Sequence, residues 1–355
     1  MIDTLLELTN SAAGAFSEAA MHALFGRDVR DLPALMPSPK DTVFTDGTAS
    51  LYRFRRPAGA PAAPRLPLLV VPSMINRWYV LDLRKGSSFV EALAAAGHDV
   101  FLLDWGVPRD EDRHIAWDQV IDRLDRFVRR VRRITGAPKV GVLGYCMGAT
   151  LSGIYTSLHP ERVAALVNLA GPFDFSKSGL LGHLVQPGWF NPEAVAAAGN
   201  VSPAQMQSGF TALRPSMTVS KLVNVADRMK QPSSLAGFYA METWGNDNIP
   251  FPAAAYQTYI TELYQQNLLV KGEHRVRGVV ADLANITCPI LVIGADRDTI
   301  CPLPAARALI ERAGSTDTQV LQVPGGHVGA VVGSRASHDL YPATAAWLRE
   351  RLDRN

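Results

Sequence analysis

Short apolar segments alternate with amphipathic helical segments along most of the chain. Apolar residues recur every three or four positions from Val120 to Ile134, which is the period of an amphipathic helix. Further helices are expected at about 304–313 and 340–352. Strand-length apolar runs that are rich in Val, Ile and Leu and separated by helices are typical of a parallel sheet covered on both faces. These runs are 68–71, 100–103, 140–143, 163–169, 290–293 and 319–323.

The alternation stops over residues 171–280. This stretch is rich in Pro, Gly, Met and aromatic residues, and it has helical patches without a convincing series of strands. Because it lies between two core strands, we expect it to be a mainly helical cap over a site. The core is then formed by residues 46–170 and 281–355.

The N-terminal part has a different pattern. Residues 1–45 predict a helical arm that closes with a Pro-rich stretch, and a short β-rich piece follows at Leu51–Phe54. The arm has acidic residues among its apolar ones and no basic start, which argues against a secretory signal. No apolar run reaches the roughly 18 residues that would suggest a transmembrane segment.

Composition narrows the classes of function. The 355 residues include 35 Lys and Arg against 33 Asp and Glu, for a formal net charge of +2. This near balance argues against nucleic acid as a partner. The cysteines are Cys146, Cys288 and Cys301, an odd number without paired or metal-ligand spacing. We therefore expect a reduced, cytoplasmic protein without a structural metal.

The third apolar run leads directly into Gly144-Tyr145-Cys146-Met147-Gly148, and a helical segment follows. This is the nucleophile-elbow pattern G-x-S-x-G with Cys in place of Ser. A sharp strand-to-helix turn needs small flanking residues, which Gly144 and Gly148 supply. The helix N-terminus favours the thiolate of Cys146, and the backbone N–H of Met147 points to where an oxyanion would form. The alternative is a buried structural Cys beside two chance glycines; the position between strand and helix favours a nucleophile.

The partners of a nucleophile are expected in the order acid, then histidine. The run 290–293 is followed by two aspartates, Asp296 and Asp298. From the residues alone both remain candidates for the acid, and the loop that begins at Asp298 favours that residue. His327 follows the last strand on a Gly-Gly loop, where a general base can reach back to Cys146.

The second oxyanion donor is expected in the loop after the first core strand, Pro72–Tyr79. A backbone N–H near Met74 or Ile75 is the candidate, and we choose Ile75. The apolar residues of this loop could equally belong to the core.

Cysteine suits ester synthesis better than hydrolysis. When a thiol attacks an acyl thioester, the product is another thioester, so the acyl group stays activated for attack by an alcohol. An apolar cap would help by excluding water. Aromatic residues of the stretch 171–280 could line such a pocket or form the core of the cap; they are Phe173, Phe175, Trp189, Phe190, Phe210, Phe238, Trp244 and Phe251.

Dispersed segments from about residue 45 onward resemble polyhydroxyalkanoate synthases. They occur in the order typical of that family: Val71-Pro72, Ile75–Leu83, Leu103–Gly106, Gly144–Gly148, Asp174-Phe175, Leu213–Pro215, Trp244–Asp247 and Gly326–Val328. One position departs, because the family's box normally ends Gly-Gly and this chain has Ala149. We expect a small geometric shift from the added methyl group.

The resemblance implies the α/β-hydrolase fold, with a doubly wound, mostly parallel sheet and an inserted helical cap. It implies polymerisation of (R)-3-hydroxyacyl-CoA into polyester with release of CoA, and no cofactor beyond this thioester substrate. In that scheme Cys146 carries the growing chain. His327 deprotonates the thiol and the incoming hydroxyl, and Asp298 assists His327.

The resemblance leaves the assembly open. The short length is similar to catalytic subunits that work with a second, non-catalytic subunit, whereas Val71–Leu83 is similar to the longer single-subunit type. We expect a homodimer, located in the cytoplasm and, by resemblance, at the surface of polyester granules. Two alternatives remain: a Cys-dependent thioesterase or polyester depolymerase on the same scaffold, and an inactive granule-associated homologue.

Overall fold

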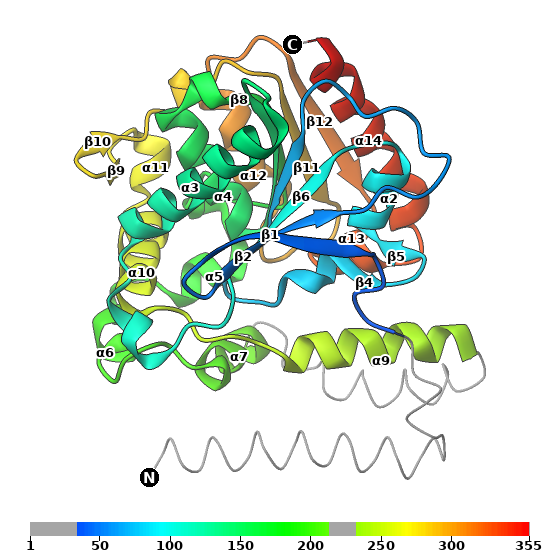
Figure 1. The fold of residues 1–355 in the computed structure, drawn as a ribbon. Helices are drawn as coiled ribbons and strands as arrows, with labels where there is room; N and C mark the ends of the chain where they lie inside the picture. Colours follow the sequence, from blue (N-terminus) through cyan, green and yellow to red (C-terminus); the bar gives the residue numbers. More distant parts are fainter. Residues whose placement is uncertain (1–33, 213–231, 355) are drawn as a thin grey trace.

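The structure is a computed structural model, which describes residues 34–212 and 232–354. Within these residues the largest sheet has eight strands in the spatial order β1-β2-β6-β3-β7-β8-β11-β12 (Figure 1). Neighbours run parallel from β6 to β12, whereas β1, β2 and β6 pair antiparallel. The strands are β1 Lys40–Asp46, β2 Ala49–Phe54, β3 Leu68–Val71, β6 Val100–Asp104, β7 Val140–Tyr145, β8 Val163–Leu169, β11 Ile290–Ala295 and β12 Thr318–Val323.

The predicted core strands are confirmed, and β7 and β11 extend two residues further than predicted. One prediction near the N-terminus is wrong. Residues 40–45, assigned to the helical arm 1–45, belong to strand β1. The reason is a tight hairpin to β2, in which Gly47 takes a φ of 62° that permits the turn. Residues 1–33 of the predicted arm lie outside the described residues.

The sheet separates two apolar clusters. In β3, Leu69 and Val71 face one cluster, and Leu68 and Val70 face the other, as the alternation of a strand requires. Helices α3 Trp117–Thr135, α4 Met147–Leu158 and α12 Leu303–Arg312 cover the first face. Helices α2 Phe89–Ala95, α13 Gly329–Val332 and α14 Ala336–Arg354 cover the second. The helices predicted at 120–134, 304–313 and 340–352 are therefore confirmed as α3, α12 and α14.

The segment predicted as a cap, 171–280, is mainly helical where it is described; residues 213–231 lie outside the described residues. Its helices gather beside and below the sheet in Figure 1. They are η5 Phe175–Lys177, α5 Gly179–Leu184, α6 Pro192–Ala196, α7 Pro203–Ala212, α9 Pro232–Asn246, α10 Ala253–Thr258, the π-helix η6 Tyr259–Gln265 and α11 Leu268–Lys271, and a short hairpin of β9 Arg275–Val276 and β10 Val279–Val280 follows. Its role as a cap stays a prediction.

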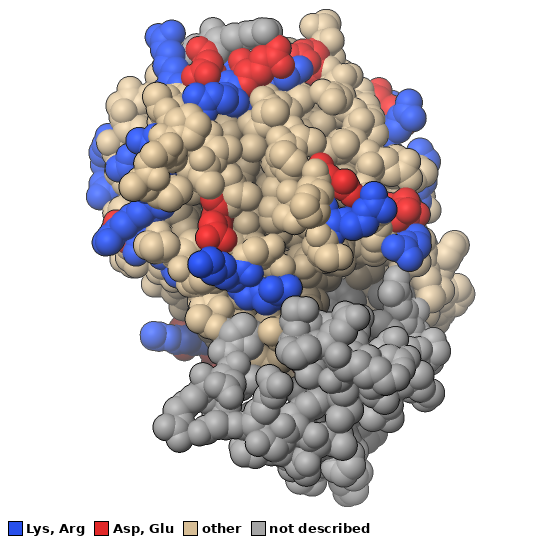
Figure 2. Space-filling view, turned by 90° about the vertical axis from the view of Figure 1, so that its right-hand side faces the viewer, with Lys and Arg blue, Asp and Glu red and all other residues tan. Residues whose placement is uncertain are grey.

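Short elements connect the core strands. Between β3 and β6 lie the 3₁₀ helix η2 Trp78–Leu81 and a small hairpin of β4 Asp82–Arg84 and β5 Ser87–Ser88. The other connections contain η3 Asp110–His114, η4 Pro160–Arg162 and η7 Leu283–Asn285. On the face shown in Figure 2, basic and acidic side chains are interspersed among uncharged surface, which agrees with the balanced composition.

Candidate active site

Cys146 occupies a strained turn between β7 and α4. Its φ is 55° and its ψ is −128°, a conformation that non-glycine residues rarely adopt. The turn is fixed on both sides, because Cys146 N–H donates to the Leu169 carbonyl and the Cys146 carbonyl accepts from Ala149 N–H, each at 2.9 Å. Helix α4 begins at Met147, so the amides of its first turn face the region of the thiol.

The two elbow glycines are required by close backbone contacts. A side-chain carbon at Gly144 would lie within 3.0 Å of the Ala149 backbone, and one at Gly148 within 3.0 Å of the Val71 and Pro72 carbonyl oxygens. Neither backbone can move without breaking the sheet or the helix. The expected need for small residues on both sides of Cys146 therefore has a structural cause.

The departure at Ala149 is accommodated by a glycine on the neighbouring loop. The Ala149 side chain is buried, and a side-chain carbon at Gly171 would lie within 3.0 Å of it. The loop of Gly171 is itself held by Asn168, whose amide oxygen accepts from Gly171 N–H at 2.9 Å. The extra methyl group thus fills the space that Gly171 leaves free, and the strained turn at Cys146 is kept.

His327 and Asp298 form a buried pair. His327 Nδ1 lies 2.7 Å from Asp298 Oδ2, and Asp298 Oδ1 accepts from the N–H groups of Ile300 and Cys301 at 2.9 Å each. Asp296, the competing aspartate, is directed elsewhere: its Oδ1 accepts from Gly325 N–H at 2.7 Å, and its side chain is 44% exposed. The geometry brings Asp298, and not Asp296, to the histidine.

The electrostatics link His327 to the thiol. Burial lowers the pKa of the His327 imidazole, but the neighbouring Cys146 and Asp298 outweigh burial and raise it to about 10. The second ring nitrogen, Nε2, is buried and has no close hydrogen-bond partner among the described residues, although interaction with the Cys146 thiol contributes to the raised pKa. An imidazole that a carboxylate orients at one nitrogen, with the other available to the thiol, is the arrangement that a general base needs.

The other cysteines are poor nucleophiles. Burial raises the pKa of Cys288 to about 12, and burial with the negative charge of Asp298 raises the pKa of Cys301 well above its usual range. Because thiolates and not thiols react, Cys288 and Cys301 are unsuited to nucleophilic attack at neutral pH. Among the other histidines, His274 is fully buried, with Nδ1 at 2.8 Å from Glu262 Oε2.

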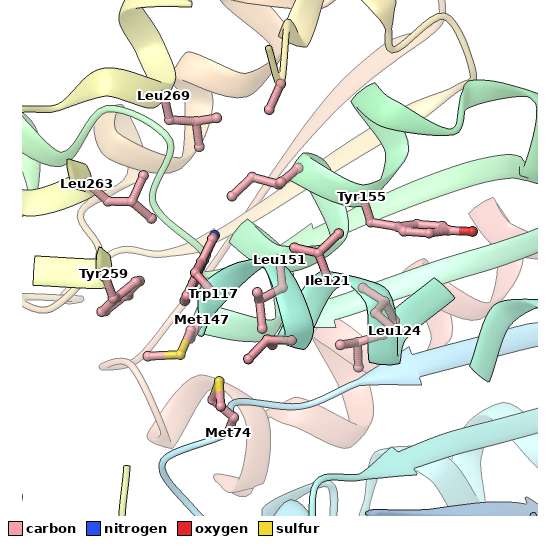
Figure 3. Packing of buried hydrophobic residues seen from close by; sticks show 14 of the residues in the cluster. Met74, Trp117, Ile121, Leu124, Met147, Leu151, Tyr155, Tyr259, Leu263 and Leu269 are labelled. Carbon is pink, nitrogen blue, oxygen red and sulfur yellow. The ribbon is translucent and has the colours of Figure 1, made fainter. Parts of the chain in front are cut away.

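The two predicted oxyanion donors, the N–H groups of Met147 and Ile75, differ in their surroundings. Met147 starts α4, so its N–H has no acceptor within the helix. Ile75 N–H points to Ser73 Oγ at 3.4 Å, a long hydrogen bond that a stronger acceptor can replace. Figure 3 shows the side chains of Met74 and Met147 next to each other, with Tyr259 nearby. Both loops therefore meet beside the elbow; that Met147 and Ile75 bind an oxyanion stays a prediction.

Two tyrosines of the π-helix η6 were missed by the sequence interpretation. Tyr259 and Tyr264 are buried with ring centroids 5.4 Å apart, and the charge of Cys146 contributes to raising the pKa of each phenol, after burial. Tyr259 also stacks on Trp117 with centroids 5.4 Å apart. A π-helix is rare and common at functional sites, but no sequence period marks it.

The aromatic residues of the predicted cap differ in burial. Phe173, Phe175 and Phe251 are fully buried and belong to the core, whereas Trp189 is 72% exposed. Within the described ranges, no cluster of His, Cys, Asp and Glu has the arrangement of a metal site, and no helix has the length and apolarity to cross a membrane.

Comparisons with known proteins define the class. Residues 67–333 match the family described as "alpha/beta hydrolase fold". A putative lipase from Sulfolobus solfataricus superposes with a TM-score of 0.57 at 15% identity, over 88% of this chain and 93% of that chain. A monoacylglycerol lipase from Paleococcus ferrophilus gives 0.55 at 15% identity, over 85% and 99%. The chain has the α/β-hydrolase fold, as predicted.

The sequence comparisons go further. Residues 40–93 match the family "Poly-beta-hydroxybutyrate polymerase (PhaC) N-terminus". The poly(3-hydroxyalkanoate) polymerase subunit PhaC of Allochromatium vinosum is 37% identical over 320 residues, covering 88% of this chain and 89% of that protein. The Synechocystis protein of the same name is 33% identical over 323 residues, covering 88% and 85%. The chain belongs to the poly(3-hydroxyalkanoate) polymerase family, an acyltransferase type of enzyme, and the predicted resemblance is confirmed.

Proposed function

We propose that this protein polymerises (R)-3-hydroxyacyl-CoA into polyhydroxyalkanoate through an acyl thioester on Cys146. The observation that carries the proposal is the strained Cys146 elbow beside a His327–Asp298 pair that is buried and hydrogen-bonded at 2.7 Å. The names of the relatives support the polymer product. The catalytic roles of the three residues are part of the proposal.

The first step is transfer of the acyl group to the enzyme. In the resting pair His327 holds the proton of the Cys146 thiol, and the sulfur attacks the thioester carbonyl carbon. The developing oxyanion is stabilised by the N–H groups of Met147 and Ile75. The carbon–sulfur bond to CoA then breaks, and His327 returns its proton to the CoA thiolate. CoA leaves, and the acyl group stays on Cys146.

The second step forms the ester bond. His327 removes the proton of a 3-hydroxyl group, and the resulting oxygen attacks the acyl thioester on Cys146. The carbon–sulfur bond breaks and the ester forms. Because Asp298 holds Nδ1, it keeps the ring oriented and stabilises its positive charge in both steps. Water would give hydrolysis at the same carbon, so exclusion of water decides between synthesis and hydrolysis.

The surface supports contact with an insoluble product. Residues 178–191 contain no Asp, Glu, Lys or Arg, and Leu180 and Trp189 are 47% and 72% exposed. The Gln265 amide holds this stretch by donating to the Val185 and Phe190 carbonyls at 2.8 and 3.1 Å. We include in the proposal a location at polyester granules in the cytoplasm. A homodimer and a second subunit also remain proposals; the word "subunit" in the relatives' names supports the latter.

The test is incubation of the purified protein with 3-hydroxybutyryl-CoA. We expect release of CoA together with insoluble polyester, and loss of both in Cys146→Ala. Stoichiometric free 3-hydroxybutyrate would instead identify a thioesterase. CoA release that is unchanged in Cys146→Ala would exclude the thioester mechanism, and an inactive wild-type protein would favour a granule-associated homologue. Adding a neighbouring subunit from the same source tests the partner.

A further inference from the structure

The loop that carries the second oxyanion donor is held by a segment far away in the sequence. We call residues 72–79 the oxyanion loop and residues 244–248, at the end of α9 and just beyond it, the latch segment. The two are joined by an antiparallel bridge between Asn76 and Asn248 and by the Asn76 Nδ2 to Asn248 Oδ1 hydrogen bond of 2.6 Å.

Two further hydrogen bonds join the oxyanion loop to the latch segment. The Trp244 indole Nε1 donates to the Arg77 carbonyl at 2.8 Å, and the Tyr79 hydroxyl donates to Asp247 Oδ2 at 2.9 Å. Arg77 Nε lies 3.4 Å from the same carboxylate oxygen. Trp244 and Tyr79 are buried, so the donor side of both hydrogen bonds is shielded from water, whereas the Asp247 side chain is 48% exposed.

The start of the oxyanion loop is rigid for another reason. The Val71 and Pro72 carbonyls lie directly against Gly148 of the elbow, and the Trp105 indole donates to the Pro72 carbonyl at 3.0 Å. Between this fixed start and the latch segment, the only hydrogen bond of Ile75 N–H among residues 34–212 and 232–354 is the long one of 3.4 Å to Ser73 Oγ. The orientation of the Ile75 N–H therefore depends on residues 76–79, which the latch segment holds.

We infer that Tyr79, Asp247 and Asn248 are positioning residues that hold the oxyanion loop in its productive conformation. The inference rests on the proposed function, because it assigns the loop to the same acyl-transfer site. None of these residues touches the reacting atoms. Release of the latch segment misplaces one oxyanion donor but leaves the Cys146–His327–Asp298 set intact.

A pair of reactions separates this role from general damage. Alkylation of Cys146 by iodoacetamide is a displacement at saturated carbon and creates no oxyanion, whereas acyl transfer from 3-hydroxybutyryl-CoA does. We expect Tyr79→Phe and Asp247→Asn to lower kcat for CoA release by about 10- to 100-fold, a little less than removal of a donor. KM stays within about twofold and the alkylation rate is unchanged, since the thiol and its base are untouched.

The matched control is Tyr155→Phe. Tyr155 is buried, and its hydroxyl donates to Asp125 at 3.0 Å, so this variant deletes the same type of hydrogen bond away from the loop. We expect it to keep the wild-type kcat. Equal kcat in Tyr79→Phe and Tyr155→Phe would overturn the inference, as would a parallel fall in alkylation. Asn248→Ala provides a third variant if one of the others does not fold. Failure of the proposed function would show differently, as a wild-type protein that releases no CoA.

Discussion

The nucleophile elbow and the oxyanion loop lie side by side but are held in opposite ways. At the elbow, backbone contacts against Gly144 and Gly148 and the first turn of α4 leave Cys146 a single conformation. The oxyanion loop is instead held by side chains of a segment about 170 residues further along the chain. In the proposed mechanism the nucleophile is therefore part of the core, whereas the orientation of one oxyanion donor depends on the latch segment.

This difference assigns the two halves of catalysis to different parts of the structure. Changes in the core should affect the thiol and its base, and changes at the latch should affect only the stabilisation of the oxyanion. Acyl transfer would then depend on whether the latch segment is packed against the oxyanion loop. The predictions below test how strictly the two regions are separate.

The largest expected effect is the loss of activity when His327 or Asp298 is replaced. We expect His327→Gln to lower the rate of CoA release by about 10²- to 10⁴-fold, the usual contribution of a general base. Asp298→Asn should lower it by at least about 10²-fold, because the ring loses its orientation. Asp296→Asn is the control and should stay near wild type, since Asp296 is half-exposed and bonded to Gly325. Equal losses in both aspartate variants would contradict the geometry.

The pH dependence of thiol reactivity should change with the histidine. Because the His327 pKa is raised to about 10, the ring keeps its positive charge beside the sulfur through neutral pH and loses it only as the pH rises through that value. Alkylation of Cys146 by iodoacetamide should therefore be faster at pH 7 in the wild type than in His327→Gln, which lacks this charge. The difference between the two rates should narrow as the pH rises toward 10, where the wild-type ring loses its charge. Parallel profiles would show that His327 does not act on the sulfur.

A smaller effect is expected on stability at the elbow. Gly148→Ala places a methyl group against the Val71 and Pro72 carbonyls and should lower the free energy of unfolding by about 1–3 kcal/mol or more. Gly188→Ala is a suitable control, because no atom lies within 4 Å of the added carbon. Denaturant unfolding of the two variants measures the difference. Equal midpoints would mean that the elbow is less tightly packed than the structure indicates.

The smallest expected effect concerns the methyl group of Ala149. Gly171→Ala should destabilise the protein by about 1–3 kcal/mol, because its new methyl group overlaps that of Ala149. The double variant with Ala149→Gly should recover part of this loss, measured as the coupling free energy of a double-mutant cycle. Additive effects would contradict direct contact between the two positions.

The contrast between elbow and loop also explains what the sequence could predict. The parallel sheet, its helices and the elbow follow from local patterns, because strand and helix periods and two glycines determine them. The edge strand β1 was missed since its pattern is weak and its pairing depends on the turn at Gly47. The order along the chain left two candidate aspartates, and the loop that begins at Asp298 favoured that residue; the hydrogen bonds then show that Asp298, and not Asp296, contacts His327.

Residues that act through long-range contacts could not be found in this way. Tyr264 lies on the π-helix η6 and responds to the charge of Cys146, and Asp247 meets Tyr79 where α9 packs on β4 next to the loop. Neither arrangement has a sequence period. The contact of the buried His274 with the part-exposed Glu262 is equally hidden, since His274 stands in a charged stretch of the sequence.

Mass spectrometry of the acylated enzyme is the most direct test of whether Cys146 carries the acyl group. The protein is mixed with 3-hydroxybutyryl-CoA, quenched in acid within seconds and digested. The peptide containing Cys146 should gain the mass of the hydroxybutyryl group or its oligomers, and neutral hydroxylamine should remove them, as expected for a thioester. CoA release with the acyl group on another residue, or on none, would contradict it.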